Sequence, residues 1–196
     1  MRLILLDTET NGLDPFIHNV IEIAIKIVDA VTGDVIDEYE SKVRLTEDEW
    51  GKSQKSSLHI NGFKFEMIKD APSLDEVRNS IMEFFKKNSL KRGKSVFLCQ
   101  NPSFDRVFFS KVIPTSEQEL RMYPYHWLDL ASMFWALSLK KNKLPWDVGL
   151  SKNKIATHLN IEEEGIPHKA MNGVNHLLSC YESLIGFAEN RIKEAL

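Results

Sequence analysis

Apolar residues in the first 44 positions follow patterns that predict three β-strands. RLILL at residues 2–6 is a continuous apolar run, as in a buried strand, and VIEIAIKIV at residues 20–28 is a second run with two charged interruptions. TGD at residues 32–34 supplies a turn, and VIDEYESKVR at residues 35–44 then alternates apolar and polar residues, as in a strand with one exposed face. The three segments together predict an antiparallel meander.

The middle of the chain changes to helical spacing. SLDEVRNSIMEFFKK at residues 73–87 starts on a serine with a glutamate three residues later, which is a capping box, and its apolar residues fall on one helical face. SVFLCQ at residues 95–100 is a short apolar strand. NPSFDRVFFSKV at residues 101–112 follows as a helix, with Asn101 suited to the N-cap and Pro102 to the first helical position.

Helices dominate the second half of the chain. The predicted helical segments are WLDLASMFWALSL at residues 127–139, SKNKIATHL at residues 151–159 and the long stretch 170–196. A meander that passes into strands flanked by helices predicts an α/β fold, a mixed sheet with helices packed on it. Because the chain has 196 residues and contains no linker or repeat, we expect a single domain over residues 1–196.

Composition and charge restrict the classes of partner. Hydrophobic residues make up 43% of the chain and charged residues 27%, as in a water-soluble globular protein. The formal net charge of -3 argues against a protein that coats nucleic acid or membranes through bulk electrostatics. Any polyanion is therefore expected to bind locally, through metal ions or small basic clusters.

The cysteines and the apolar runs indicate a cellular compartment. Cys99 and Cys180 each lie in an apolar segment without a CxxC spacing, which predicts two buried free thiols in a reducing environment. The apolar run before Asp7 has only four residues, 3–6, too few for a secretory signal, and no run approaches 18 apolar residues. We expect a cytoplasmic protein with no membrane partner.

Three acids stand where two predicted strands end. Asp7 and Glu9 close the first strand, and side chains two residues apart on a strand share a face and lie about 6.6 Å from each other. Asp105 falls in the first turn of the helix that follows residues 95–100. DTETNGLDP is also good turn chemistry and Asp105 alone would suit a capping role, but oxygen donors gathered from three places favour a hard divalent ion.

The ordered set of motifs resembles the histidine-containing branch of the DEDD exonucleases, which includes polymerase proofreading subunits, oligoribonuclease and ribonuclease T. The blocks are DTET with two strand-end carboxylates, N-x-x-F-D before a helix, and PHKAM with a late histidine. Glu22 in VIEIA is similar to the second-strand pattern of the family, and HINGF at residues 59–63 falls where such proteins often have a nucleotide-contacting loop. The resemblance spans Asp7 to Val174. It implies a ribonuclease H-like mixed sheet and a metal-dependent 3'-5' exonuclease that releases 5'-mononucleotides from single-stranded DNA or RNA 3' ends.

The resemblance also implies roles for individual residues. Asp7 would bridge two divalent ions, Mg²⁺ or Mn²⁺, Glu9 would complete one coordination shell and Asp105 would hold the other ion through water. His168 would be the general base that takes a proton from the attacking water, a task that suits an imidazole near neutral pH. The expected substrate contacts are Thr8, Thr10, His59, Gly62, Asn101 and Phe104.

One expected ligand is absent. The family has its last acid five residues after the histidine, and Gly173 stands at that position in HKAMNGVNH. A glycine supplies no side-chain ligand and costs about 1 kcal/mol relative to alanine inside a helix. Three explanations remain open: a weakened enzyme, a substitution acquired by or introduced into this chain, and a catalytically inactive exonuclease-like module that binds nucleic acid or protein.

Other chemistries and partners are less well supported by the sequence. LILLDTET approximates the D-x-D-x-T strand of haloacid-dehalogenase-type phosphatases, but Glu9 is longer than that pattern requires. The chain also lacks a convincing later pair of acids beside a lysine on the expected strand. No phosphate-binding G-x-x-x-x-G-K-[ST] loop occurs. A homodimer or a polymerase partner stays open. Two basic clusters are explained more simply by solvated helix ends than by a nucleic-acid path: Lys86, Lys87, Lys91, Arg92 and Lys94, and then Lys140, Lys141 and Lys143.

Overall fold

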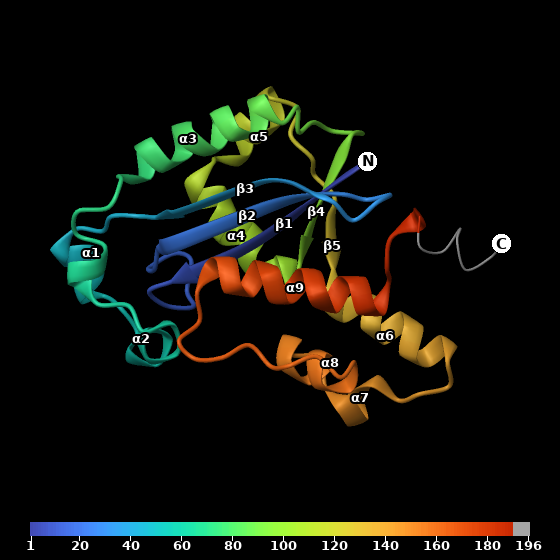
Figure 1. The fold of residues 1–196 in the computed structure, drawn as a ribbon. Helices are drawn as coiled ribbons and strands as arrows, with labels where there is room; N and C mark the ends of the chain where they lie inside the picture. The colour runs from blue at the N-terminus through green and yellow to red at the C-terminus, as the bar shows by residue number, and fades with distance from the viewer. Residues whose placement is uncertain (190–196) are drawn as a thin grey trace.

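A single mixed β-sheet forms the centre of the protein in the computed structural model, which describes residues 1–189 (Figure 1). Its strand order is β3-β2-β1-β4-β5. β1 pairs antiparallel with β2 and parallel with β4; β2 also pairs antiparallel with β3, and β4 parallel with β5. The strands are β1 (Arg2–Thr10), β2 (Val20–Asp29), β3 (Val35–Lys42), β4 (Ser95–Cys99) and β5 (Trp127–Asp129).

Helices cover both faces of this sheet. In Figure 1, α3 to α5 lie on one side of the strands and α6 to α9 on the other. The helices are α1 (Glu47–Gly51), α2 (Lys55–Asn61), α3 (Leu74–Lys87), α4 (Pro102–Val112), α5 (Thr115–Leu120), α6 (Leu130–Lys140), α7 (Pro145–Val148), α8 (Lys152–His158) and α9 (Ala170–Leu184), with one 3-10 turn at Phe65–Met67.

Alternation along β1 divides the core into two layers. Ile4 and Leu6 belong to a buried cluster that includes residues of α3 and α4. Leu3 and Leu5 belong to a second cluster, which includes residues of α6, α8 and α9. Because side chains two residues apart share a face, the acids that follow Leu5 on the same parity are directed toward the α9 side.

The predicted meander and mixed sheet are confirmed, and the differences have local causes. The third strand ends at Lys42. β5 was not predicted because three residues give no alternation to detect; its Trp127 ring stacks on Phe97 with centroids 4.0 Å apart. The helix expected over residues 170–196 ends at Leu184, just before Gly186 adopts a left-handed φ of 73°. Residues 190–196 of that prediction lie outside the described part.

Three further predictions concern the two cysteines and the N-caps of α3 and α4. Cys99 and Cys180 are free and buried, as predicted. The capping box of α3 forms between Ser73 and Glu76. Asn101 occupies the N-cap of α4, but its side chain makes no capping bond to the helix and instead accepts a hydrogen bond from Ser103 Oγ at 2.6 Å.

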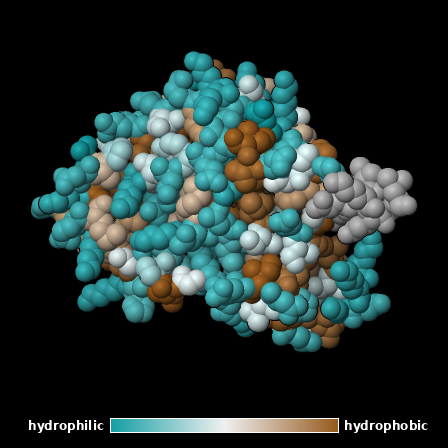
Figure 2. Space-filling model, viewed as in Figure 1, coloured by the Kyte–Doolittle hydropathy of each residue, from teal (hydrophilic) through white to brown (hydrophobic). Residues whose placement is uncertain are grey.

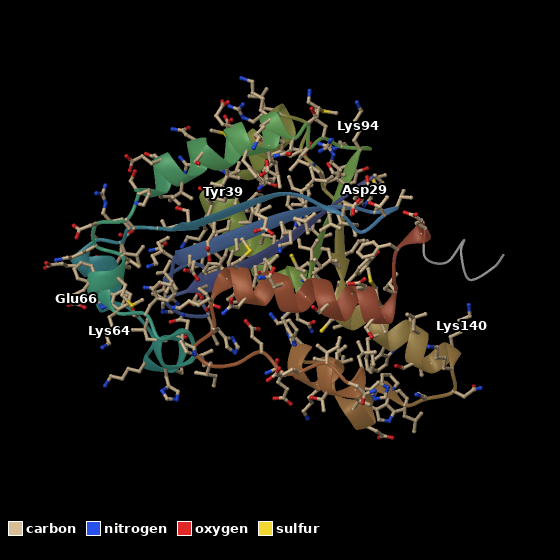
Figure 3. The ribbon with its side chains drawn as sticks, viewed as in Figure 1. Asp29, Tyr39, Lys64, Glu66, Lys94 and Lys140 are labelled. Atoms are coloured by element: carbon tan, nitrogen blue, oxygen red, sulfur yellow. The ribbon has the colours of Figure 1, made fainter. Side chains whose placement is uncertain are left out.

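Hydrophilic and hydrophobic side chains are unevenly distributed on the face that Figure 2 draws. Hydrophilic side chains cover most of the face drawn in Figure 2, and hydrophobic ones form smaller patches. Lys94 receives a hydrogen bond from Arg2 N at the start of β1, and Figure 3 shows Lys94 and Lys140 at the periphery, away from α2. Because a strand rises about 3.3 Å per residue, Lys94 lies roughly 26 Å from the other end of β1. Among the described helices, none is long and apolar enough to cross a membrane.

Candidate active site

The C-terminal end of β1 carries the first two acids. Asp7 pairs with Ala24 and Glu9 with Glu22 in the ladder to β2, and a bulge follows between Glu9 and Thr10. Asp7 is half-buried, and Glu9 is 9% exposed. The strand therefore holds both carboxyl groups on the face that α9 covers.

The third acid is brought to the same place by parallel strand pairing. Because β4 runs parallel to β1, the helix that follows β4 begins at the sheet edge where β1 ends. Asp105 lies in the first turns of that helix and is 5% exposed. Its Oδ1 accepts hydrogen bonds from Thr8 N at 3.1 Å and from Thr8 Oγ1 at 2.9 Å. Asp105 is thus tied to the residue between the two strand-end acids.

The segment before α9 positions His168. The backbone N–H of His168 donates to the carbonyl oxygen of Ile60 in α2 at 3.0 Å. The Lys169 ammonium donates to the carbonyl oxygen of Asn61 at 3.0 Å and lies 3.7 Å from the centroid of the Phe63 ring. These contacts fasten His168 and the residue after it to α2 and to Phe63.

Glu22 anchors the start of α9. Its Oε2 accepts a hydrogen bond from Ala170 N at 2.9 Å, and burial raises the pKa of this carboxyl above its ordinary value. An acceptor at this point satisfies one of the free N–H groups of the helix N-terminus. The glutamate in VIEIA therefore helps to place the helix that faces Asp7.

A pocket of about 370 Å³ lies where these elements meet. Most of the residues that the sequence analysis proposed as catalytic, metal-binding or substrate-binding line this pocket. Those lining it are Asp7, Thr8, Glu9, Thr10, Asn101, Phe104, Asp105 and His168. Residues that line it without having been nominated are Leu13, Ser57, Ile60, Asn61, Gln100, Lys152 and Glu164.

His59 and Gly62 lie outside this lining. The stretch HINGF was expected to be a loop, but its first residues complete the helix α2, in which successive side chains are turned by about 100°. The exposed His59 therefore faces away from the pocket, while Ile60 and Asn61 line it. Gly62 caps the helix with a φ of 67°, and a Cβ there would meet Pro167 at 2.9 Å.

An ion pair that the sequence did not reveal stands inside the pocket. Lys152 Nζ lies 2.7 Å from Glu164 Oε2, with side-chain exposures of 13% and 4%. The same ammonium donates to the carbonyl oxygen of Gly173 at 3.3 Å. SKNK and EEEG look like solvated polar stretches, so no local pattern marks either residue.

Gly173 allows the Asp7 side chain to lie against α9. A Cβ at residue 173 would come within 2.2 Å of Asp7 Oδ2 and 2.7 Å of Asp7 Cγ. It would also lie 3.2 Å from Lys152 Nζ. The glycine therefore has a steric role that the sequence did not reveal, because the space of a side chain is filled by a carboxylate and bordered by an ammonium.

Burial dominates the electrostatics of the acids. It raises the pKa of Glu9 to about 8, with the charge of Asp7 acting in the same direction. It also raises the pKa of Asp105 to about 8, again with help from Asp7 and against the hydrogen bonds from Thr8. Burial raises the pKa of Asp7 as well, while Lys152 opposes that rise. The positive charge near these three carboxyl groups is therefore too small to offset the cost of burying their ionised forms.

A hard divalent cation fits the chemistry of these donors. Asp7, Glu9 and Asp105 supply carboxylate oxygens, the ligands that Mg²⁺ and Mn²⁺ prefer, and a cation would offset the cost of burying them together. Within residues 1–189, no three His, Cys, Asp or Glu side chains already surround one ion. The carboxylates would therefore have to turn toward a bound ion.

Comparison with known proteins identifies the family. The sequence profile of the RNase T exonuclease family matches residues 4–178. The chain belongs to this exonuclease family. Among the relatives of this exonuclease chain, the oligoribonuclease of Photobacterium profundum is 30% identical over 140 residues, which cover 67% of the chain and 72% of that protein. The PolC-type DNA polymerase III of Thermotoga petrophila is 32% identical over 115 residues, which cover 56% of the chain and 7% of that protein.

Solved structures share the fold of this exonuclease-family chain at low identity. Cell-death related nuclease 4 superposes with a TM-score of 0.72 at 17% identity, covering 94% of this chain and 63% of that one. E. coli Exonuclease I in complex with a dT13 oligonucleotide gives a TM-score of 0.75 at 16% identity, covering 99% and 43%. The chain thus spans less than two thirds of several matched proteins. The expected ribonuclease H-like fold and the DEDD resemblance are confirmed.

We expect Asp105→Asn to stabilise the protein in EDTA. A carboxyl whose folded pKa is raised binds its proton more tightly in the folded state, so its contribution to stability falls as pH rises from about 4 to about 8. The amide can still accept from Thr8 but carries no charge. At pH 8.5 the variant should melt roughly 4–8 °C above the parent, corresponding to about 2 kcal/mol.

Thermal melts followed by circular dichroism between pH 5 and pH 8.5 measure this effect. Asp70→Asn replaces an exposed aspartate and serves as the matched control, with a shift near zero. A parent protein whose melting temperature does not decline over this range, together with an unchanged Asp105→Asn variant, would contradict the electrostatic account.

Proposed function

We propose that this chain is a metal-dependent 3'-5' exonuclease that acts on single-stranded DNA or RNA and releases 5'-mononucleotides. The observation that carries the proposal is the meeting of Asp7, Glu9, Asp105 and His168 in one pocket. The proposed reaction is hydrolysis of the phosphodiester bond nearest the 3' end of the strand. The family match and the nuclease relatives support this class of reaction.

The pocket has the size and lining for a terminal nucleotide. Its volume of about 370 Å³ falls in the range of small-molecule sites. Leu13 and Phe104 offer apolar surface against which a base can pack, and Asn101 offers an amide for sugar or phosphate contacts. The Phe104 ring is held by Phe108, with centroids 4.8 Å apart. A chain end fits such a site better than the middle of a duplex, whose bases are stacked.

His168 is assigned the proton transfer. It lines the pocket that holds the carboxylates, and its backbone is fixed to α2 through Ile60. A neutral imidazole can take a proton from a water that attacks the phosphorus. The bond from phosphorus to the 3'-oxygen then breaks, and that oxygen leaves with a proton from solvent. The product is a nucleoside 5'-monophosphate.

Asp7, Glu9 and Asp105 would hold a divalent ion. When bound, such an ion polarises the phosphate and activates water. The residues themselves orient it: β1 fixes two of the carboxyl groups, and Thr8 ties the third to the same strand.

A second candidate function rests on Lys152. Its ammonium already opposes the charge of Asp7 and pairs with Glu164, so the pocket has a cation without any metal. A catalytically inactive module that binds single-stranded ends would use the same lining. Binding of an oligonucleotide without any release of mononucleotides would favour this alternative.

His168→Gln should lose most of the nuclease activity. Removing a general base typically costs 10²–10⁴-fold in rate, so we expect a loss of about 100-fold or more. The assay is release of mononucleotides from single-stranded DNA and RNA labelled in the 3'-terminal nucleotide, in Mg²⁺ or Mn²⁺. A 3'-phosphorylated oligonucleotide tests whether the enzyme starts at a free 3' end.

His126→Gln is the matched control, because His126 is exposed and lies outside the pocket lining. It should retain the parental rate. A His168→Gln variant that is as active as the parent would remove the imidazole from the mechanism, and an inactive parent would reject the proposed reaction.

Gly173→Ala should also lower the activity. The added Cβ would lie 2.2 Å from Asp7 Oδ2, so the carboxylate must move, and displacing a group at a reacting centre by about 1 Å can cost about 100-fold. Gly165→Ala is the control, because a Cβ there meets nothing within 4 Å. Equal rates for the two variants in the same mononucleotide assay would mean that the contact of Asp7 with α9 does not matter.

A further inference from the structure

The space beside Gly173 holds two charged groups. The Asp7 carboxylate fills the position that a Cβ would take, at 2.2 Å from Oδ2, and Lys152 Nζ lies 3.2 Å from the same point. The ammonium also donates to the carbonyl oxygen of Gly173. Lys152, the first residue of α8, therefore lies close to the Asp7 carboxylate at the point where α9 passes it.

Glu164 fixes the ammonium there. Its Oε2 lies 2.7 Å from Lys152 Nζ, and its side chain is only 4% exposed. The backbone N–H of Glu164 donates to Asn153 Oδ1 at 3.1 Å, and Asn153 follows Lys152 in α8. The pair is thus held by both the side chains and the backbone.

Glu164 has acceptor capacity left over. Its Oε1 is buried and has no hydrogen-bond partner among the described residues, although it belongs to the pocket lining. A buried carboxylate oxygen without a donor is costly. This oxygen can therefore accept a hydrogen bond from a substrate, from a water, or from the Lys152 ammonium if that ammonium shifts.

We propose that Lys152, held by Glu164, is a built-in cation of the active site, so that the chain binds one divalent ion and not two. Phosphodiester hydrolysis by metal ions generally uses a pair about 3.5–4 Å apart. A second ion between Asp7 and α9 would have to enter the space bordered by the ammonium, where like charges repel and Gly173 supplies no side-chain oxygen. Lys152 instead supplies the second positive charge to the phosphate.

This inference rests on the proposed function and specifies which cations serve it: one divalent ion and the Lys152 ammonium. It also explains why residue 173, five residues after His168, is not an acid. An acid at residue 173 would collide with Asp7 in its present place. The glycine, the lysine and the glutamate therefore form one arrangement, and changing the glycine alone does not create a second ion site.

Titration calorimetry of the full chain with Mn²⁺ alone at pH 8 tests the proposal directly. We expect one ion per chain for the parent protein. Two ions per chain, or none, would overturn the proposal. Because this readout needs no substrate, it separates the ion count from the reaction: a chain that binds one ion but releases no mononucleotide refutes the exonuclease proposal alone.

Lys152→Met removes the charge and keeps the length of the side chain. We expect the mononucleotide release rate at saturating Mn²⁺ to fall about 100-fold, as for loss of a group that stabilises transition-state charge. Lys152→Arg keeps the charge and should retain most of the rate, which a purely structural role of the side chain would not predict.

Lys154→Met is the matched control in the same helix, since Lys154 is exposed and outside the pocket lining. It should leave the rate and the ion count unchanged. A Lys152→Met protein that melts like the parent and keeps the parental rate would overturn the proposal, and so would an equal loss in Lys152→Arg.

Discussion

The structure depends on burying three carboxyl groups, those of Asp7, Glu9 and Asp105, around one pocket. Removing a carboxylate from water without a partner is unfavourable, and crowding several together adds repulsion. The raised pKa values of about 8 for Glu9 and Asp105 express that cost. The chain reduces it with hydrogen bonds from Thr8 and with the ammonium of Lys152, but part of the cost remains. That remainder is what a bound cation would remove.

The fold explains why these groups meet. β1 contributes alternating side chains to both core layers, so its backbone is fixed. By the same alternation, Asp7 and Glu9 near its end point to one face of the sheet. Parallel pairing with β4 brings the start of α4 to the same edge. Glu22 on β2 then receives the first N–H of α9, which carries Gly173 past Asp7. The pocket is therefore built from segments far apart in the sequence but adjacent on one sheet edge.

The sequence predicts the parts of the site that follow from local pattern. Acids at a strand end and an acid in the first turns of a helix are visible in DTET and NPSFD, and the histidine in PHKAM is visible through family resemblance. Their presence in one pocket agrees with that reading. It was harder to predict which side chains of a short helix face the pocket. Interpreting HINGF as a loop pointed to His59, whereas α2 turns Ile60 and Asn61 toward the pocket.

What the sequence could not predict depends on close approach in three dimensions. Lys152 and Glu164 sit in polar stretches and become buried only because α8 and the following loop fold over the pocket. Gly173 reads as a lost ligand, yet its lack of a side chain is what admits the Asp7 carboxylate. In our proposal, this apparent loss of a ligand belongs to a rearranged set of charges that includes Lys152 and Glu164.

The central claim is that the buried carboxylates form a cation site, and diffraction tests it most directly. Crystals soaked with Mn²⁺ and a nucleoside 5'-monophosphate should show an anomalous peak in contact with oxygens of Asp7, Glu9 and Asp105, beside the imidazole of His168. A peak elsewhere, or well-ordered carboxylates with no manganese between them at saturating concentration, would contradict the account.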